Sequence, residues 1–165
     1  MKRIKFFSAF MVMFVFGISA FSQKQIPEIK IKDLNGKSTD IKTILNDKAT
    51  VICFFATWCK PCLIEMNAIS DEYEDWQGES DFEMIAISVD DSKSNANLKS
   101  LVNGNDWPFE VYSDSNSELK RALNIGSIPY SLIVNKKGEI VYEKTSYTVG
   151  AEYELYQKFK ELNSK

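Results

Sequence analysis

The chain has 165 residues, of which 44% are hydrophobic and 26% charged, a composition typical of one globular domain. Its formal net charge of −3 argues against a nucleic-acid partner. The sequence contains no histidine, which excludes histidine-based acid–base catalysis and most transition-metal sites, so we expect no bound metal. Three cysteines are too few for a disulfide scaffold of the kind found in small secreted domains.

The first 22 residues have the three parts of a secretory signal peptide. Basic residues precede a nearly unbroken apolar run at positions 6–18. Ala20 and Ser22 then place small residues at the positions that a signal peptidase reads, which predicts cleavage before Gln23. The apolar run is short for a bilayer span, which needs about 20 residues. An uncleaved membrane anchor is the alternative.

Cleavage would leave a mature domain over residues 23–165, located outside the cytoplasm in the periplasm or cell envelope. It would remove three positive charges and no negative ones, so the mature domain is more acidic than the whole chain. An acidic domain of this kind is typical of a soluble protein and disfavours adhesion to an anionic membrane.

The first half of the mature chain predicts a hairpin, a central strand and a long helix. Residues 29–32 alternate apolar and polar side chains, and Asn35-Gly36 follows as a hairpin signal before a helical turn. The apolar run at 49–56 fits a central strand covered on both faces. Over residues 60–76 apolar side chains recur at three- and four-residue steps, which predicts a helix that Gly78 ends.

The second half predicts further strands and helices that close with a hairpin and an amphipathic helix. In chain order these are a strand at 82–89, a surface helix at 92–102 ended by Asn103 and Gly104, a short strand at 109–112, a helical segment at 117–123, strands at 130–134 and 139–143 joined by a turn, and a helix at 152–162. Strands that alternate with helices in this way indicate an α/β domain with one mixed sheet.

Two cysteines lie where the central strand meets the long helix, in the sequence Trp58-Cys59-Lys60-Pro61-Cys62. Cysteines at this spacing can close a small disulfide ring. Cys59 would lie at the helix N-terminus, where free N–H groups and the helix dipole stabilise a thiolate, and Lys60 adds positive charge nearby. Pro61 suits the first helical turn because no N–H partner is lost there. We therefore expect a redox-active pair.

Two less reactive interpretations of this pair are a structural zinc site and a structural disulfide. Zinc would need two more ligands, and the chain offers only Cys53 and no histidine. A disulfide across so short a loop would add little stability through chain entropy. Cys53 itself lies inside the apolar strand, so we expect a buried core residue, with a regulatory thiol as the alternative.

Spacing alone leaves two interpretations for each of two residues near the pair. Glu65 lies three residues after Cys62, on the same face of the predicted helix. It could take up and return a proton as the second thiol reacts, or it could complement the helix dipole near its positive end. Pro129 precedes the strand at 130–134, where an ordinary trans proline is also acceptable.

Three stretches of the chain carry a family resemblance. They are FFATWCKPC at residues 54–62 with Glu65 following, DLNGK at residues 33–37, and IGSIP at residues 125–129. These stretches resemble the thioredoxin-like superfamily and, within it, the exported TlpA/ResA-like branch, also grouped with the AhpC/TSA-like proteins. The resemblance extends over residues 26–162 and implies a mixed central β-sheet flanked by helices, with an N-terminal β-hairpin and a central helical insertion.

The resemblance also implies a role for each site residue. Cys59 matches the attacking thiol, Cys62 the resolving thiol and Glu65 the family's acidic residue. Pro129 matches a cis-proline, and the backbone around Ile128 would hold the substrate as an added strand. The residues expected to contact the substrate are Trp58, Lys60, Pro61, Ile128 and Pro129.

Members of this branch reduce oxidised proteins outside the cytoplasm, including apocytochromes awaiting haem, and are themselves reduced by a membrane-bound donor. We therefore expect an exported protein-disulfide reductase whose partners are oxidised proteins and such a donor. Its Cys59–Cys62 dithiol would serve in place of a separate cofactor. Cys59 thiolate would attack a substrate disulfide, and Cys62, deprotonated near Glu65, would resolve the mixed disulfide.

Two positions depart from the family pattern. Asn67 stands where relatives often have a proline, which leaves a kink in the helix open. Cys53 stands at the position of the buried acid of thioredoxin, so no carboxylate comes from that strand. We therefore expect any buried proton acceptor to be Glu65.

Other activities fit the motif less well. A disulfide oxidase or isomerase is the nearest alternative, but strongly oxidising enzymes place a histidine between the cysteines, and this chain has none. A peroxiredoxin-like peroxidase would need threonine three residues before its reactive cysteine, where Ala56 precedes Cys59. A metal-delivery protein of the Sco type would need CxxxC and a histidine. A non-enzymatic interaction module with incidental thiols is the remaining class.

Overall fold

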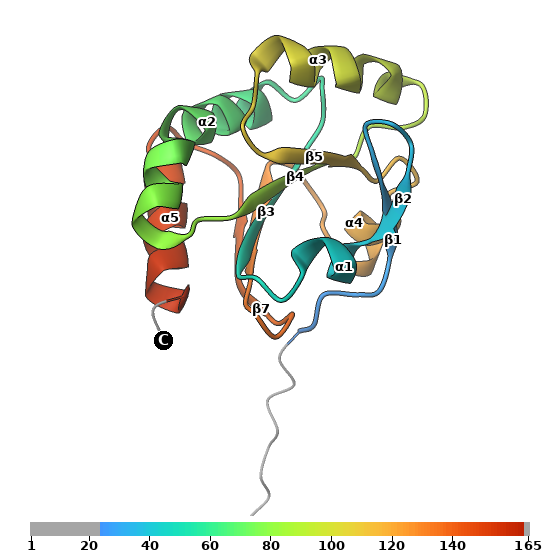
Figure 1. Ribbon diagram of the computed structural model, residues 1–165. Helices are drawn as coiled ribbons and strands as arrows, with labels where there is room; N and C mark the ends of the chain where they lie inside the picture. The colour runs from blue at the N-terminus through green and yellow to red at the C-terminus, as the bar shows by residue number, and fades with distance from the viewer. Residues whose placement is uncertain (1–23, 164–165) are drawn as a thin grey trace, which may run out of the picture.

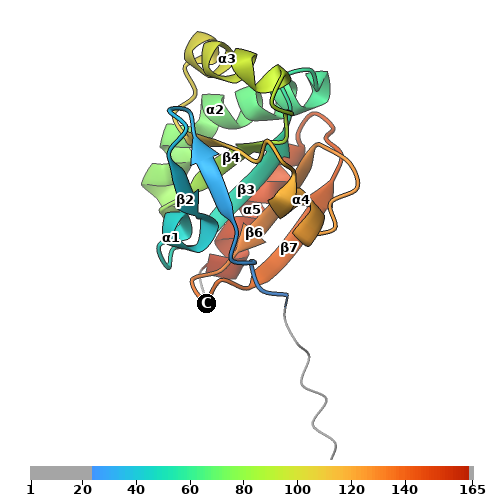
Figure 2. The ribbon, with the colours of Figure 1, turned by 90° about the vertical axis from the view of Figure 1, so that its right-hand side faces the viewer.

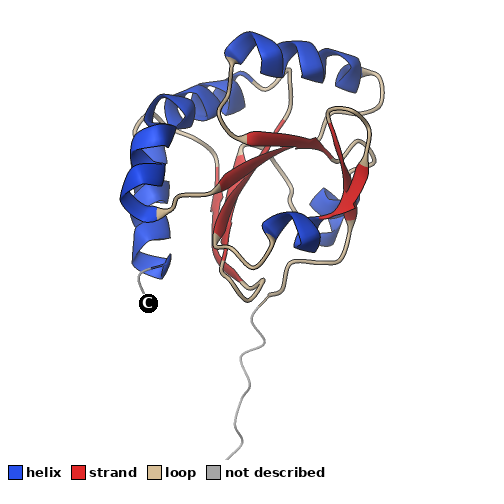
Figure 3. Ribbon diagram, viewed as in Figure 1, coloured by secondary structure: helices blue, strands red, loops and turns tan. Residues whose placement is uncertain are grey.

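The computed structural model describes residues 24–163, which form a seven-stranded mixed sheet with helices on both faces (Figures 1 and 3). The strands are β1 (Lys30–Asp33), β2 (Ser38–Asp40), β3 (Thr50–Phe55), β4 (Met84–Ser88), β5 (Glu110–Ser113), β6 (Tyr130–Val134) and β7 (Ile140–Thr145). The helices are α1 (Ile41–Leu45), α2 (Lys60–Ser80), α3 (Leu98–Asn105), α4 (Glu118–Ala122) and α5 (Ala151–Asn163), with a 3₁₀ turn (Ser94–Asn97) before α3.

The predicted signal peptide at residues 1–22 lies outside the described residues. Within residues 24–163, no helix combines the length and the apolar character that a bilayer span requires.

The strand order β2-β1-β5-β4-β3-β6-β7 confirms the predicted mixed sheet. β3, β4 and β5 run parallel, whereas β6 pairs antiparallel with β3 and β7 with β6. The expected N-terminal hairpin is β1 with β2, and the expected helical insertion lies between β4 and β5. β3 is buried along its whole length, as its unbroken apolar run predicts.

The side chains of β3 divide the interior into two apolar clusters, because successive strand residues point to opposite faces. Val51, Cys53 and Phe55 pack with α2, α3 and α5, whereas Ile52 and Phe54 pack with α1 and α4. Figures 1 and 2 show these two groups of helices on opposite sides of the sheet. The junction of β3 and α2 is thereby held between two packed layers.

Two predicted helix ends are wrong by a few residues. α2 continues past Gly78 to Ser80, and α3 continues past Gly104 to Asn105. Each helix ends instead on an aspartate in the left-handed conformation, Asp81 or Asp106, whose N–H bonds the carbonyl four residues earlier. Aspartate tolerates this conformation. A glycine inside a helix costs only about 1 kcal/mol relative to alanine, so each helix can continue past its glycine.

The helix α2 runs without a break through Asn67, the position where a proline kink was left open. The Asn67 side chain accepts a hydrogen bond from the indole N–H of Trp107 at 2.8 Å. Trp107 packs in turn against Phe55 and Phe109. This contact attaches the first half of α2 to the segment that leads into β5.

Candidate active site

Cys59 and Cys62 form a disulfide where β3 passes into α2, with an S–S distance of 2.08 Å and a Cα–Cα distance of 5.3 Å. Cys59 is the N-cap residue of α2. Its N–H donates a hydrogen bond to the Ala56 carbonyl at 3.0 Å, which closes the turn before the helix. Cys59 keeps 6% of its surface exposed, whereas Cys62 is fully buried. An incoming group therefore reaches Cys59 first, as the attacking role requires.

The residues around the pair present an apolar and positively charged rim. Trp58 is 68% exposed, an unusual setting for a tryptophan. Lys60 and Pro61 are exposed as the first two residues of α2. The proline takes the place where a helix has no partner for an N–H. An exposed indole and a lysine thus flank the more accessible cysteine.

The loop before β6 lies at the same edge of the sheet. The Ile128–Pro129 peptide bond is cis, as the family resemblance implies. β6 pairs antiparallel with β3, with Tyr130 opposite Phe54. Ile128 and Pro129, which precede Tyr130, therefore lie beside the carboxyl end of β3. The redox loop, residues 56–59 between β3 and α2, begins at that end. Ile128 packs against the apolar cluster that contains both cysteines. The structure therefore places Ile128 and Pro129 at the edge of the sheet where Trp58, Lys60 and Pro61 also lie.

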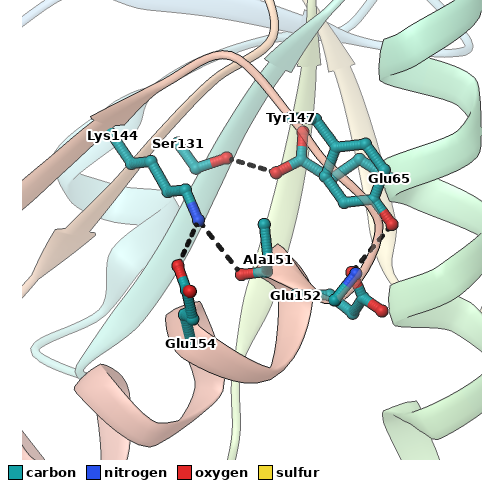
Figure 4. A network of polar contacts seen from close by, with 8 residues as sticks. Glu65, Ser131, Lys144, Tyr147, Ala151, Glu152 and Glu154 are labelled. Atoms are coloured by element: carbon teal, nitrogen blue, oxygen red, sulfur yellow. Dashed lines mark hydrogen bonds and ion pairs between the residues drawn. The ribbon is translucent and has the colours of Figure 1, made fainter.

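Glu65 is buried, with 3% of its surface exposed, and its two carboxyl oxygens differ (Figure 4). Oε1 accepts a hydrogen bond from the Ser131 hydroxyl at 3.1 Å. Oε2 is buried and has no hydrogen-bond partner among the described residues. Burial raises the pKa of Glu65 from its usual 4.5 to about 7, although the Ser131 bond and the Lys144 charge act in the opposite direction. This burial disfavours the interpretation of Glu65 as a charge that merely complements the helix dipole.

The connection between β7 and α5 lies beside this acid, as Figure 4 shows. Lys144, at the end of β7, bonds the Glu154 carboxylate at 3.0 Å. Tyr147 donates its hydroxyl to Glu152 at 2.7 Å. The charge of Glu152 adds to the burial effect on the pKa of Glu65, whereas that of Lys144 lowers it. The two charges oppose each other at the buried acid.

Cys53 is a free, fully buried cysteine on β3, which confirms the predicted core position. Burial, followed by the charge of Glu65, raises the pKa of its thiol well above the usual range. The Ser131 hydroxyl lies 3.3 Å from its sulfur. A thiol in this setting stays protonated at neutral pH and is a poor nucleophile.

Asp90 is a second buried acid beside the redox loop, and spacing along the sequence did not single it out. It is fully buried after β4 and accepts the Thr57 N–H and hydroxyl, both at 2.9 Å, and the Ser88 hydroxyl at 2.7 Å. Thr57 immediately precedes Trp58, so these bonds hold the start of the loop. One signal was present in the sequence: Asp90 follows a buried strand, where polar side chains collect at the edge of a parallel sheet.

Known proteins resemble this chain over most of its length. The model of the AhpC/TSA family matches residues 22–143. The thiol-disulfide oxidoreductase ResA of a Bacillus cereus strain is 30% identical over 118 residues, which cover 72% of this chain and 66% of that protein, just under two thirds of its length. The sporulation thiol-disulfide oxidoreductase A of Bacillus subtilis is 28% identical over 125 residues, covering 74% of this chain and 73% of that protein.

A solved structure supports the fold. The solution structure of an uncharacterized thioredoxin-like protein from Porphyromonas gingivalis matches with a TM-score of 0.75 and 42% sequence identity. The match covers 86% of this chain and 94% of the other. The predicted thioredoxin-like fold is confirmed.

Proposed function

The chain belongs to the AhpC/TSA family, and on that premise we propose that it is a thiol–disulfide oxidoreductase that reduces disulfides in exported proteins through Cys59 and Cys62. The observation that carries this proposal is the disulfide at the N-terminus of α2, beside the cis-proline loop. The two curated relatives described above carry the name thiol-disulfide oxidoreductase, which supports the same reaction class.

In the reducing direction the dithiol form of the enzyme acts first. The Cys59 thiolate attacks one sulfur of a substrate disulfide, and the other substrate sulfur leaves as a thiolate and takes up a proton. The Cys62 thiolate then attacks the Cys59 sulfur in the mixed disulfide, which closes the internal disulfide and releases the second substrate thiol. Two electrons pass to the substrate, and the enzyme ends in the oxidised form seen in the structure.

The first step depends on thiolate at Cys59. Its position as N-cap of α2 places the sulfur near unpaired backbone N–H groups and the positive end of the helix dipole. Lys60 is the next residue and adds a positive charge on the exposed side. Both effects favour the ionised sulfur over the thiol.

The second step requires that Cys62 lose a proton inside the protein. Glu65 lies one helical turn further along α2, is buried like Cys62, and has one oxygen without a partner in the described part of the chain. Because burial brings the pKa of Glu65 to about 7, the group can accept and return a proton near neutral pH. Glu65 thus serves Cys62 as a local acid and base.

The rim of the site would contact the oxidised protein substrate. Trp58 offers a large exposed apolar surface, and Lys60 and Pro61, between the two cysteines, are exposed as well. The half-buried Ile128 and the buried cis-Pro129 would border an extended substrate segment, which backbone hydrogen bonds would hold.

We place this activity outside the cytoplasm, because residues 1–22 have the pattern of a signal peptide. Oxidised envelope proteins, apocytochromes c among them, would be substrates, and a membrane-bound donor would return the enzyme to its dithiol form. Sequencing the N-terminus of protein from its native envelope tests the export step. A start at Gln23 is expected, and an intact Met1 would instead indicate an anchored form.

The reaction itself is tested by trapping. Cys62→Ser should leave substrates attached to Cys59 as mixed disulfides, because the resolving thiol is absent. The adducts are separated on non-reducing gels from envelope extracts and identified by mass spectrometry. The matched control is the double variant Cys59→Ser, Cys62→Ser, which retains Cys53. Equal adducts in this control would contradict the assignment of Cys59 as the attacking thiol.

A further inference from the structure

Three buried side chains from three different elements are joined through one serine hydroxyl. Glu65 comes from α2, Ser131 from β6 and Cys53 from β3. The Ser131 oxygen lies 3.1 Å from Oε1 of Glu65 and 3.3 Å from the sulfur of Cys53. The antiparallel register pairs Ser131 directly with Cys53, which explains their contact. Serine in a strand this deeply buried, with 2% exposed, needs such partners.

We propose that Ser131 is a positioning residue of the redox site: its hydroxyl holds Oε1 of Glu65 and so leaves Oε2 as the oxygen that exchanges a proton with Cys62. This inference rests on the proposed role of Glu65 in the reaction.

The two oxygens of a free carboxyl group are equivalent, because the group can turn about its last torsion. The bond from Ser131 removes this equivalence, since it is made to Oε1 alone. Within residues 24–163, Oε2 is the buried side-chain oxygen left without a hydrogen bond. Such an atom costs free energy in a folded protein, so its presence on a residue one helical turn from Cys62 points to a use in the reaction.

The hydroxyl of Ser131 can serve both protonation states of Glu65. It has one proton and can donate to one acceptor at a time. When Glu65 is ionised, the charged Oε1 is the stronger acceptor. When Glu65 is protonated, the hydroxyl can turn to the sulfur of Cys53, whose thiol stays protonated because burial raises its pKa. Cys53 thus gives the hydroxyl a neutral alternative partner, and no net proton transfer is needed.

Other groups around Glu65 act through charge and not through a direct hydrogen bond. Lys144 of β7 favours the ionised form, but its ammonium bonds Glu154. Glu152 of α5 favours the protonated form and is itself bonded by Tyr147 (Figure 4). On its own helix, Glu65 lies three residues after the buried Cys62, one turn along the same face. Ser131 is therefore the hydrogen-bond donor that orients the carboxyl group.

The test is the pH dependence of exchange in Ser131→Ala. Reduced enzyme is mixed with oxidised glutathione in single turnovers from pH 5 to 9, and the Glu65 carboxyl is titrated in parallel by ¹³C NMR. Loss of a hydrogen bond to a charged group should raise both midpoints by about one pH unit. Ser131→Thr, which keeps the hydroxyl, should restore the wild-type midpoints even if it is less stable.

Two variants provide controls for the loss of a buried polar group. Thr50→Val removes a buried hydroxyl at the other end of β3, where it bonds the Lys48 carbonyl, and should leave both midpoints unchanged. Cys53→Ala removes only the neutral partner of Ser131 and should shift them less than Ser131→Ala. A shift from Cys53→Ala as large as that from Ser131→Ala would overturn the assignment of Ser131.

The same experiment separates this inference from the proposed function. If Glu65→Gln keeps the wild-type pH dependence, Glu65 has no proton role and the proposed function is wrong at that residue. If Glu65→Gln abolishes the dependence while Ser131→Ala leaves both midpoints in place, only the inference about Ser131 is wrong. With both correct, Ser131→Ala adds no change to the pH profile in the Glu65→Gln background.

Discussion

Two buried carboxyl groups lie beside the redox loop, and they differ in how their oxygens are satisfied. Asp90 is fully buried and accepts hydrogen bonds on both oxygens, from Thr57 and Ser88. Glu65 is almost as buried, yet it accepts one bond and keeps one oxygen without a partner in the described residues. A fully bonded acid holds the geometry of the loop, whereas an incompletely bonded acid can change its protonation state during a reaction.

The elements that carry these acids explain the difference. Asp90 follows β4 and meets the loop that follows the neighbouring parallel strand β3, so the backbone N–H of Thr57 points at it. Glu65 projects from α2 onto the face of β6, where strand N–H groups are used in the sheet and Ser131 supplies the donor. A buried carboxyl with few donors titrates closer to neutral pH, which catalytic acids and bases need.

The largest effect should come from Asp90→Ala. Removing the carboxyl leaves the partly buried N–H and hydroxyl of Thr57 and the buried hydroxyl of Ser88 without their acceptor, at about 1 kcal/mol or more each. We expect the free energy of unfolding to fall by about 3–4 kcal/mol in urea denaturation. The control is Asp91→Ala, an exposed neighbour whose hydrogen bonds come from the nearby residues Lys93 and Ser94. Equal losses of stability in the two variants would show that the hydrogen bonds to Asp90 do not hold the loop.

The next effect concerns stability against pH. The folded-state pKa of Glu65, about 7, lies above its usual 4.5, so the folded state binds more protons than the unfolded state between these values. The contribution of Glu65 to stability is therefore present at low pH and is lost as pH rises. Wild type should lose about 3 kcal/mol relative to Glu65→Gln between about pH 4 and pH 8. The free energy of unfolding is measured by urea denaturation at each pH. An equal change with pH in the two proteins would show that Glu65 titrates at its usual pKa.

A smaller effect is expected from Thr57→Val, which removes one of the two bonds that Thr57 makes to Asp90 and keeps the side-chain shape. The free energy of unfolding should decrease by about 1 kcal/mol, the usual net value of one hydrogen bond. Thr57→Ser keeps the hydroxyl and should lose less. If Thr57→Val is neutral in urea denaturation, the side-chain bond does not help to hold the loop.

The smallest effects should have opposite signs. Glu152→Gln removes a negative charge that raises the pKa of Glu65, and Lys144→Gln removes a positive charge that lowers it. The exchange midpoint should therefore move down in the first variant and up in the second, each by less than about half a pH unit. Added salt should reduce both shifts. Shifts of the same sign would show that the variants act through structure and not through charge.

Features that depend on neighbouring residues followed from the sequence by itself. A β-rich apolar run at residues 49–56, followed by Cys59 and then by helical periodicity, was sufficient to place the cysteine pair at a helix N-terminus, as the structure confirms. The burial of Cys53 followed from its place in the same run. The cis bond at Pro129 came from the family resemblance and not from spacing, and the signal peptide stays a prediction.

The hydrogen-bond partners of the two acids depend on contacts between distant parts of the chain. The bond between Glu65 and Ser131 joins residues 66 positions apart, and that between Thr57 and Asp90 joins residues 33 positions apart. Periodicity indicates which face of its own element a residue occupies, but it carries no information about which residue of another element lies opposite. That partner depends on strand order and register across the sheet, which come from the packing of the whole chain.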